Sequence, residues 1–132
     1  MAVLDASVLS EYLAGGEHAA QARRWMLEDA GRLWAPHLID AEVGHVLRRA
    51  EARGELSART ARAALADLAE LPLLRVAHVG LLDRAWALRR NVSFYHGLYV
   101  ALAERTGETL LTLDARLAAA ASGLLARIEL VA

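Results

Sequence analysis

Two aspartates stand directly after apolar runs of the sequence. Asp5 follows Ala2-Val3-Leu4, and Asp114 follows a Leu-Leu-Thr-Leu step. Such short apolar runs are typical of buried parallel strands, and ligands of open parallel sheets bind beyond the carboxyl ends of the strands. If the two strands are neighbours, both carboxylates face one crevice, where burying them unpaired is costly. A divalent cation relieves that cost, and Mg²⁺ or Mn²⁺ prefers oxygen ligands.

Each aspartate also has a simpler interpretation. Asp5 and Asp114 both precede stretches with helical character, and aspartate is a favoured N-cap residue. One aspartate after a strand is more often a cap than a metal ligand. Two at the ends of two predicted strands favour the metal site, although a capping role for each stays open.

Glu42 is a third candidate, because it lies on an apolar helix predicted over residues 38–53. A glutamate on that face needs a partner, which a metal ion or an ion pair with Arg48 or Arg49 would supply. Glu42 and His45 form one Glu-x-x-His step, whereas di-iron bundles need two. We therefore interpret His45 as a residue of the surface or of the core edge.

The elements that position these carboxylates alternate between strand and helix. The pattern of apolar residues and of helix-capping or helix-stopping residues predicts strands at 2–4, 33–35, 73–77, 109–113 and 127–131. It predicts helices at 8–13, 17–30 (ended by Gly31), 38–53, 57–70, 79–90, 95–106 and 115–121. This alternation predicts an α/β fold with a central parallel sheet and helices on both faces. A chain of 132 residues suits one domain, which we expect to span residues 1–132.

The composition excludes several classes of protein. The chain has no cysteine, so disulfides, thiolate zinc sites and cysteine nucleophiles are excluded. Its 15 basic residues are all arginine, which argues against P-loop proteins, aspartyl-phosphate phosphatases and response-regulator receivers, because all three use a lysine. The net charge is −1, unlike that of a general nucleic-acid coat. Without a long apolar run or a basic leader segment, we expect a cytoplasmic protein with no membrane partner.

Four segments in order resemble the PIN domain, and specifically the VapC toxins of type II toxin–antitoxin pairs. They are Val-Leu-Asp-Ala-Ser-Val-Leu, Ala-Pro-His-Leu-Ile-Asp-Ala-Glu-Val, Tyr-His-Gly-Leu-Tyr-Val-Ala-Leu-Ala-Glu and Thr-Leu-Asp-Ala-Arg-Leu. The resemblance covers nearly the whole chain and implies a single PIN-like domain. It also implies an Mg²⁺- or Mn²⁺-dependent ribonuclease that acts on RNA, forms a homodimer and is inhibited by a cognate VapB-type antitoxin.

The resemblance assigns roles residue by residue. Asp5, Glu42 and Asp114 match the first, second and last acids of the family's metal site. Ser7 and Thr112 match small hydroxyl residues that look like hydrogen-bond donors to those acids.

His96 departs from the family, whose third acid stands at this position and is followed by alanine rather than Gly97. Three interpretations are open: a natural nitrogen ligand, a natural loss of activity, or a deliberate change that silences a toxin. Replacing an acid by histidine removes one negative charge, and magnesium takes imidazole poorly, whereas manganese, nickel and zinc accept it. We therefore expect weaker Mg²⁺ binding and reduced nuclease activity at a site of Asp5, Glu42, His96 and Asp114. The alternative is a weak or inactive PIN-like protein that only binds its antitoxin.

Surface residues suggest where partners would bind. Arg116 and the arginine pairs at 23–24, 48–49 and 89–90, with Arg53, are candidates for holding RNA phosphates. For any one pair, a solvated helix face is the more common explanation. Four apolar residues of the first two predicted helices are interpreted as core, and the resemblance implies that part of the set docks the antitoxin: Tyr12, Leu13, Trp25 and Met26.

Overall fold

A computed structural model describes residues 1–28 and 32–132 of the chain. Within these residues, five strands form one sheet in the order β3-β2-β1-β4-β5, and every neighbouring pair is parallel. The strands are β1 (Ala2–Leu4), β2 (Leu33–Pro36), β3 (Leu73–Val76), β4 (Thr109–Thr112) and β5 (Ile128–Leu130). The predicted parallel α/β sheet is therefore confirmed.

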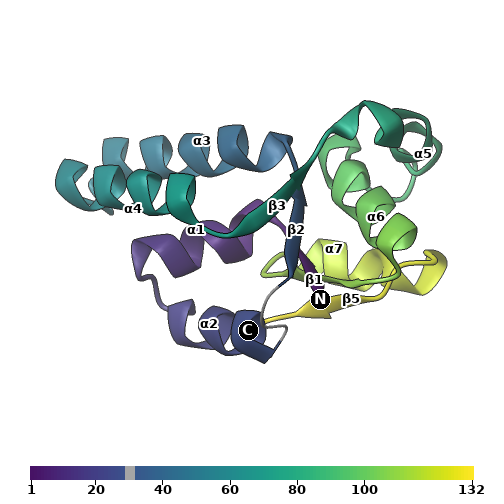
Figure 1. Cartoon of the computed structure of the whole chain (residues 1–132), viewed down its shortest axis with the longest axis horizontal. Helices are drawn as coiled ribbons and strands as arrows, with labels where there is room; N and C mark the ends of the chain where they lie inside the picture. The colour runs from purple at the N-terminus through teal and green to yellow at the C-terminus, as the bar shows by residue number, and fades with distance from the viewer. Residues whose placement is uncertain (29–31) are drawn as a thin grey trace.

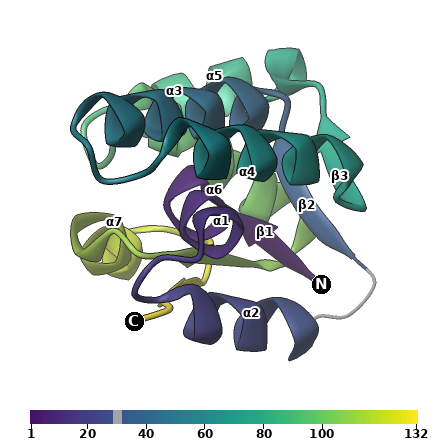
Figure 2. The same ribbon diagram turned by 90° about the vertical axis from the view of Figure 1, so that its left-hand side faces the viewer.

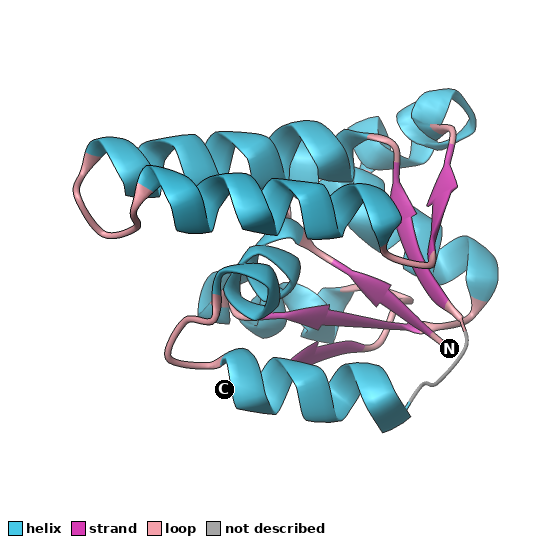
Figure 3. Ribbon diagram, turned by 60° about the vertical axis from the view of Figure 1, so that its left-hand side comes forward, coloured by secondary structure: helices cyan, strands magenta, loops and turns pink. Residues whose placement is uncertain are grey.

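Helices cover both faces of this sheet, as predicted. They are α1 (Ala6–Ala14), α2 (Ala19–Glu28), α3 (Leu38–Ala52), α4 (Ala58–Glu70), α5 (Leu82–Ala87), α6 (Phe94–Thr106) and α7 (Ala115–Ala119). Figure 1 shows α1 to α4 on one side of the strands and α5 to α7 on the other. Helices α3 and α4 lie side by side as a hairpin that extends beyond the sheet, and α2 lies apart from this hairpin, with α1 between them (Figures 2 and 3).

Several predicted helices differ from the observed ones in their bounds, most of them by one or two residues. The helix predicted over 79–90 is a 3-10 turn, His78–Leu81, followed by the short helix α5. Gly80 is a poor helix former, by about 1 kcal/mol relative to alanine, and its carbonyl accepts a hydrogen bond from the Arg105 guanidinium at 2.7 Å. The second predicted helix begins at Ala19, and its predicted end at residues 30 and 31 lies outside the described residues.

Helix α6 is the central helix of the fold. Every residue from 97 to 103 is buried, as expected for a helix that is apolar on all sides. At its start, a Cβ on Gly97 would lie only 3.0 Å from the carbonyl oxygen of Ala85 in α5. Glycine at this position therefore allows α5 and α6 to pack closely, which explains why alanine is absent here. None of the described helices combines the length and the apolar character needed to cross a membrane.

Candidate functional site

The sheet places Asp5 and Asp114 next to each other at the carboxyl ends of adjacent strands. β1 pairs with β4, with Leu4 opposite Leu111, and each aspartate follows its strand and precedes a helix. The Val8 amide donates to Asp5 Oδ1 at 3.1 Å. Both aspartates are N-caps, as the simpler interpretation held, and both also line the same open pocket of about 670 Å³. Capping and a role in this pocket are therefore compatible.

A network of hydrogen bonds fixes the Asp5 side chain, which is only 3% exposed. Ser7 Oγ donates to Asp5 Oδ1, and Thr112 Oγ1 donates to Asp5 Oδ2, each at 2.5 Å. The two hydroxyls in turn accept from the backbone amides of Leu113 and Asp114, each at 2.9 Å. The hydroxyls therefore join the ends of β1 and β4 around one carboxylate, which is the arrangement expected of hydrogen-bond donors beside the acids.

Glu42 reaches the same pocket from α3. Tyr99 Oη donates to Glu42 Oε1 at 2.6 Å, and Tyr99 is 1% exposed within α6. Among the described residues, Glu42 forms no ion pair with Arg48 or Arg49, so Tyr99 supplies the partner instead.

Tyr99 was not predicted as a site residue. It follows His96 by one turn of α6, and residues three apart lie on one face of a helix. This spacing is the signal from which it could have been found.

His96 lines the pocket from the first turn of α6. Its backbone amide donates to the N-cap Ser93 Oγ at 3.1 Å. Its Nε2 lies 3.6 Å from Asp114 Oδ2, and the two side chains are 32% and 34% exposed, respectively. The histidine thus lies beside a carboxylate at the pocket, where the family resemblance places an acid.

Burial raises the pKa of two of these carboxylates. Desolvation raises the pKa of Asp5, against the hydrogen bonds from Ser7 and Thr112, which favour the ionised form. Desolvation likewise raises the pKa of Glu42, against the bond from Tyr99. Burial and the neighbouring Glu42 raise the pKa of the Tyr99 hydroxyl, so it stays protonated and remains a donor. Positive charge placed in this pocket would relieve the cost of ionising both acids.

The donor set suits an oxygen-preferring divalent cation. Three carboxylates and one imidazole line the pocket: Asp5, Glu42, Asp114 and His96. Among the described residues, no three acidic or histidine side chains are already gathered as they would be around an ion. Asp5 and Glu42 are turned toward hydroxyl donors, but each carboxylate oxygen has a second lone pair. The residues present therefore fit such an ion, with side-chain adjustment on binding.

Other residues complete the pocket and, apart from Arg49, a candidate for binding RNA phosphate, were not predicted as site residues. Its remaining walls come from α1, α3 and the turn after α1, and include Ser10, Glu11, His18, Val46 and Arg49. A neighbouring pocket of about 320 Å³ shares two residues with it, His96 and Asp114, and is also lined by Arg116.

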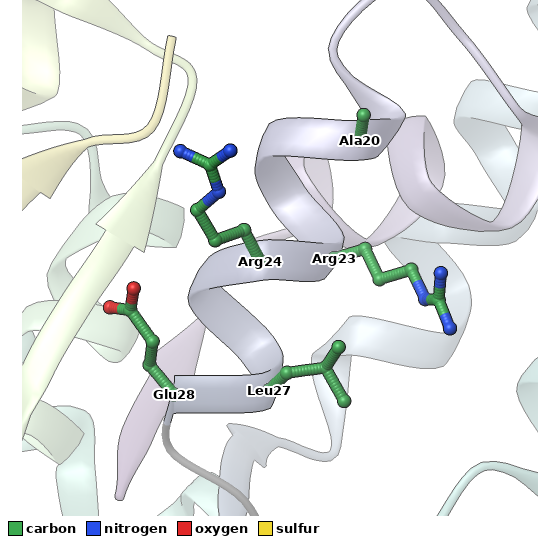
Figure 4. A pocket seen from close by; sticks show the side chains of 5 residues that line it. All are labelled: Ala20, Arg23, Arg24, Leu27 and Glu28. Atoms are coloured by element: carbon green, nitrogen blue, oxygen red, sulfur yellow. The ribbon is translucent and has the colours of Figure 1, made fainter.

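Other predicted surface residues lie away from the acidic pocket. A pocket of about 420 Å³ on α2 is lined by Arg23 and Arg24, which point to opposite sides of the helix (Figure 4). It shares no residue with the acidic pocket. The four apolar residues of α1 and α2 pack in or against the core, in agreement with their plain interpretation: Tyr12, Leu13, Trp25 and Met26.

Comparison with known proteins identifies the family. The profile of the PIN domain matches residues 2–123. The chain is 48% identical to Ribonuclease VapC1 of Mycobacterium tuberculosis (strain ATCC 25618 / H37Rv), over 98% of this chain and 96% of the relative. It is 43% identical to Ribonuclease VapC9 of the same strain, over 89% of this chain and 88% of the relative.

Two solved structures share the fold. The crystal structure of M. tuberculosis VapC20, described as a Sarcin-Ricin loop cleaving toxin, matches with a TM-score of 0.69 at 20% identity, over 95% of this chain and 97% of that one. The crystal structure of PAE2754 from Pyrobaculum aerophilum matches with a TM-score of 0.68 at 26% identity, over 98% and 83%.

Proposed function

This chain belongs to the PIN-domain family, among the VapC ribonuclease toxins, and we propose that it is a divalent-metal-dependent endoribonuclease of a toxin–antitoxin pair. One observation carries the proposal. Asp5, Glu42 and Asp114 come from three distant segments of the chain and line one pocket. Carboxylates gathered in a partly buried pocket are costly to ionise unless they are paired with positive charge, and a cation that serves phosphodiester cleavage would supply that charge.

The proposed chemistry divides between metal and protein. Mg²⁺ or Mn²⁺, held by Asp5, Glu42, Asp114 and His96, would supply a Lewis acid that activates water and stabilises charge developing on the phosphate. The protein orients the ligands: the hydroxyls of Ser7 and Thr112 hold Asp5, and the phenol of Tyr99 holds Glu42.

His96 is expected to change the metal preference and the activity of the site. With three carboxylates in place of four, the pocket attracts Mg²⁺ less strongly, and its imidazole suits Mn²⁺, nickel or zinc better. We therefore propose that the enzyme cleaves RNA with reduced activity and works better with Mn²⁺ than with Mg²⁺. A protein that only binds its antitoxin is the alternative outcome of the experiment below.

The partners follow from the same family. We propose a VapB-type antitoxin, an RNA substrate and a homodimer, with the PIN domain spanning residues 1–132 and acting on RNA in the cytoplasm. The names of the VapC relatives support the antitoxin, and the alignment over 98% of the chain supports the domain bounds.

The test is cleavage of a structured RNA with added Mn²⁺, by the purified chain and by its Asp5→Ala variant. Cleavage that requires both Mn²⁺ and Asp5 would support the proposal. Equal cleavage by the variant would indicate a contaminating nuclease. No cleavage by the unchanged chain, together with retained antitoxin binding, would establish the non-enzymatic alternative.

A further inference from the structure

Two arginines line the acidic pocket and its neighbour, one in each. Arg49 lies on the face of α3 that carries Glu42 and Val46, at the i, i+4 and i+7 positions of one helix stripe. Arg116 lies in the first turn of α7, two residues after Asp114. The two arginines are carried by α3 and α7, which cover opposite faces of the sheet (Figure 1).

The two hollows adjoin each other. The pocket of about 670 Å³ that Arg49 lines and the pocket of about 320 Å³ that Arg116 lines share His96 and Asp114. A ligand that extends from Arg49 to Arg116 therefore has to pass over the residues proposed to hold the metal. An extended chain suits this shape better than a compact small molecule.

Both guanidinium groups are free to bind an anion. Neither makes a hydrogen bond or ion pair with any residue in the described part of the chain. Other arginines are engaged: Arg75 binds Asp40 and Arg84 binds Glu104, each with a shortest distance of 2.7 Å. Free guanidinium groups beside a cluster of carboxylates would offset the repulsion that these acids exert on an approaching phosphate.

We propose that a single RNA strand lies along this groove, with Arg49 holding a backbone phosphate on one side of the phosphate to be cut and Arg116 holding one on the other. The inference rests on the proposed ribonuclease function and adds the path of the substrate. It also selects two of the 15 arginines as those that carry binding at the site.

The first test is RNA binding in EDTA, measured by fluorescence anisotropy with a short labelled single-stranded RNA over a series of salt concentrations. Each phosphate contact with a single strand contributes about 0.7 to the slope of log K against log salt. Arg49→Ala and Arg116→Ala should each weaken binding and reduce that slope by about 0.7, and the double variant by about 1.4. The matched control is Arg48→Ala, which removes an exposed arginine of the same helix that lines neither pocket.

Cleavage with Mn²⁺ separates this inference from the proposed function. If the unchanged chain cleaves RNA and the Arg49 and Arg116 variants bind and cleave like the Arg48 variant, the path is wrong and the ribonuclease stands. If binding shows the expected slopes but no cleavage occurs, the path stands and the ribonuclease fails. No measurable binding by the unchanged chain would contradict the path. Thermal melting of each variant excludes misfolding as the cause.

A second test locates the two phosphates. Single uncharged methylphosphonate linkages are placed one at a time along the RNA, and binding is measured for each protein. Arg49→Ala should lose its sensitivity to one linkage and Arg116→Ala to another, with the cleaved linkage between them. Loss of sensitivity to the same linkage in both variants would overturn the proposal.

Discussion

The acidic pocket has two halves that are held in different ways. The strand half consists of Asp5 and Asp114, which follow β1 and β4, and the helix half consists of Glu42 of α3 and His96 of α6. In the strand half, Asp5 is 3% exposed and accepts three hydrogen bonds, from Ser7, Val8 and Thr112. In the helix half, Glu42 accepts one hydrogen bond among the described residues, from Tyr99. The strand half is thus fixed by backbone and hydroxyl groups at the ends of paired strands, whereas the helix half depends on the Tyr99–Glu42 bond, which joins α6 and α3 from opposite faces of the sheet.

This difference indicates which positions of the site tolerate substitution. A carboxylate such as Asp5, tied to two strand ends, cannot be replaced without disturbing the hydroxyl network around it. His96 lies at the start of α6, about one third exposed, with its backbone held by Ser93. The departure from the family therefore falls in the half that is less constrained by the fold.

The largest effect is expected from Asp5→Ala. It removes a proposed metal ligand and the acceptor for both hydroxyls, so cleavage with Mn²⁺ should fall by about 10³-fold or more, since the metal supplies several kcal/mol of charge stabilisation. Asp67→Ala, an exposed change on α4, is the control and should retain full activity. A comparable loss in both variants would point to a general effect on the protein.

Tyr99→Phe should have the next largest effect. It removes the hydroxyl that orients Glu42 and keeps the ring, so Mn²⁺ affinity by calorimetry should fall by up to about 100-fold, the upper end for residues that hold metal ligands. Since the ring remains in the core, the thermal midpoint with EDTA should change little. Unchanged Mn²⁺ affinity would show that the hydroxyl does not position Glu42 for a metal.

Thr112→Val should have a smaller effect on Mn²⁺ affinity, of about tenfold. Asp5 keeps its bonds from Ser7 and Val8, so its carboxylate stays in place, while the loss of one donor raises its pKa further. An effect larger than that of Tyr99→Phe would reverse the comparison between the two halves.

Asp5→Asn should remove the part of the pH dependence of the thermal midpoint in EDTA that comes from ionisation of Asp5, although it also disturbs one hydroxyl contact. Burial raises the folded-state pKa of Asp5 above its ordinary value of 3.8. The folded state favours the neutral acid, and this preference adds to the free energy of unfolding. The contribution is fully present below the ordinary pKa and is lost as the pH rises through the raised pKa. Asparagine stays neutral at every pH and remains a good N-cap, so the stability of the variant relative to the unchanged chain should increase as the pH rises through the raised pKa. A pH-independent difference would exclude ionisation as its cause.

The sequence was sufficient for the strand half of the site. An apolar run ending in aspartate appears twice, and parallel pairing of β1 with β4 brings Asp5 and Asp114 together, as expected for neighbouring strands. Glu42 was identified from its apolar surroundings, and its place in the pocket agrees with the family resemblance.

The rest of the site depends on tertiary packing. The Tyr99–Glu42 bond joins residues 57 positions apart, and no local pattern encodes the distance between α3 and α6. The same holds for Arg49, whose sequence pairing with Arg48 gave no reason to prefer one over the other. Gly97 also gained its explanation only from the backbone of Ala85, which lies against it in the fold.

The most direct test of the account is the affinity of the chain and of His96→Asp for Mg²⁺ and Mn²⁺, measured by calorimetry. The account predicts that restoring an acid at this position strengthens Mg²⁺ binding by tenfold or more, since an added charge within about 4 Å contributes a few kcal/mol in a partly exposed site. Mn²⁺ affinity should change less, because manganese accepts the imidazole. Equal Mg²⁺ affinity of the two proteins would show that position 96 does not touch the metal.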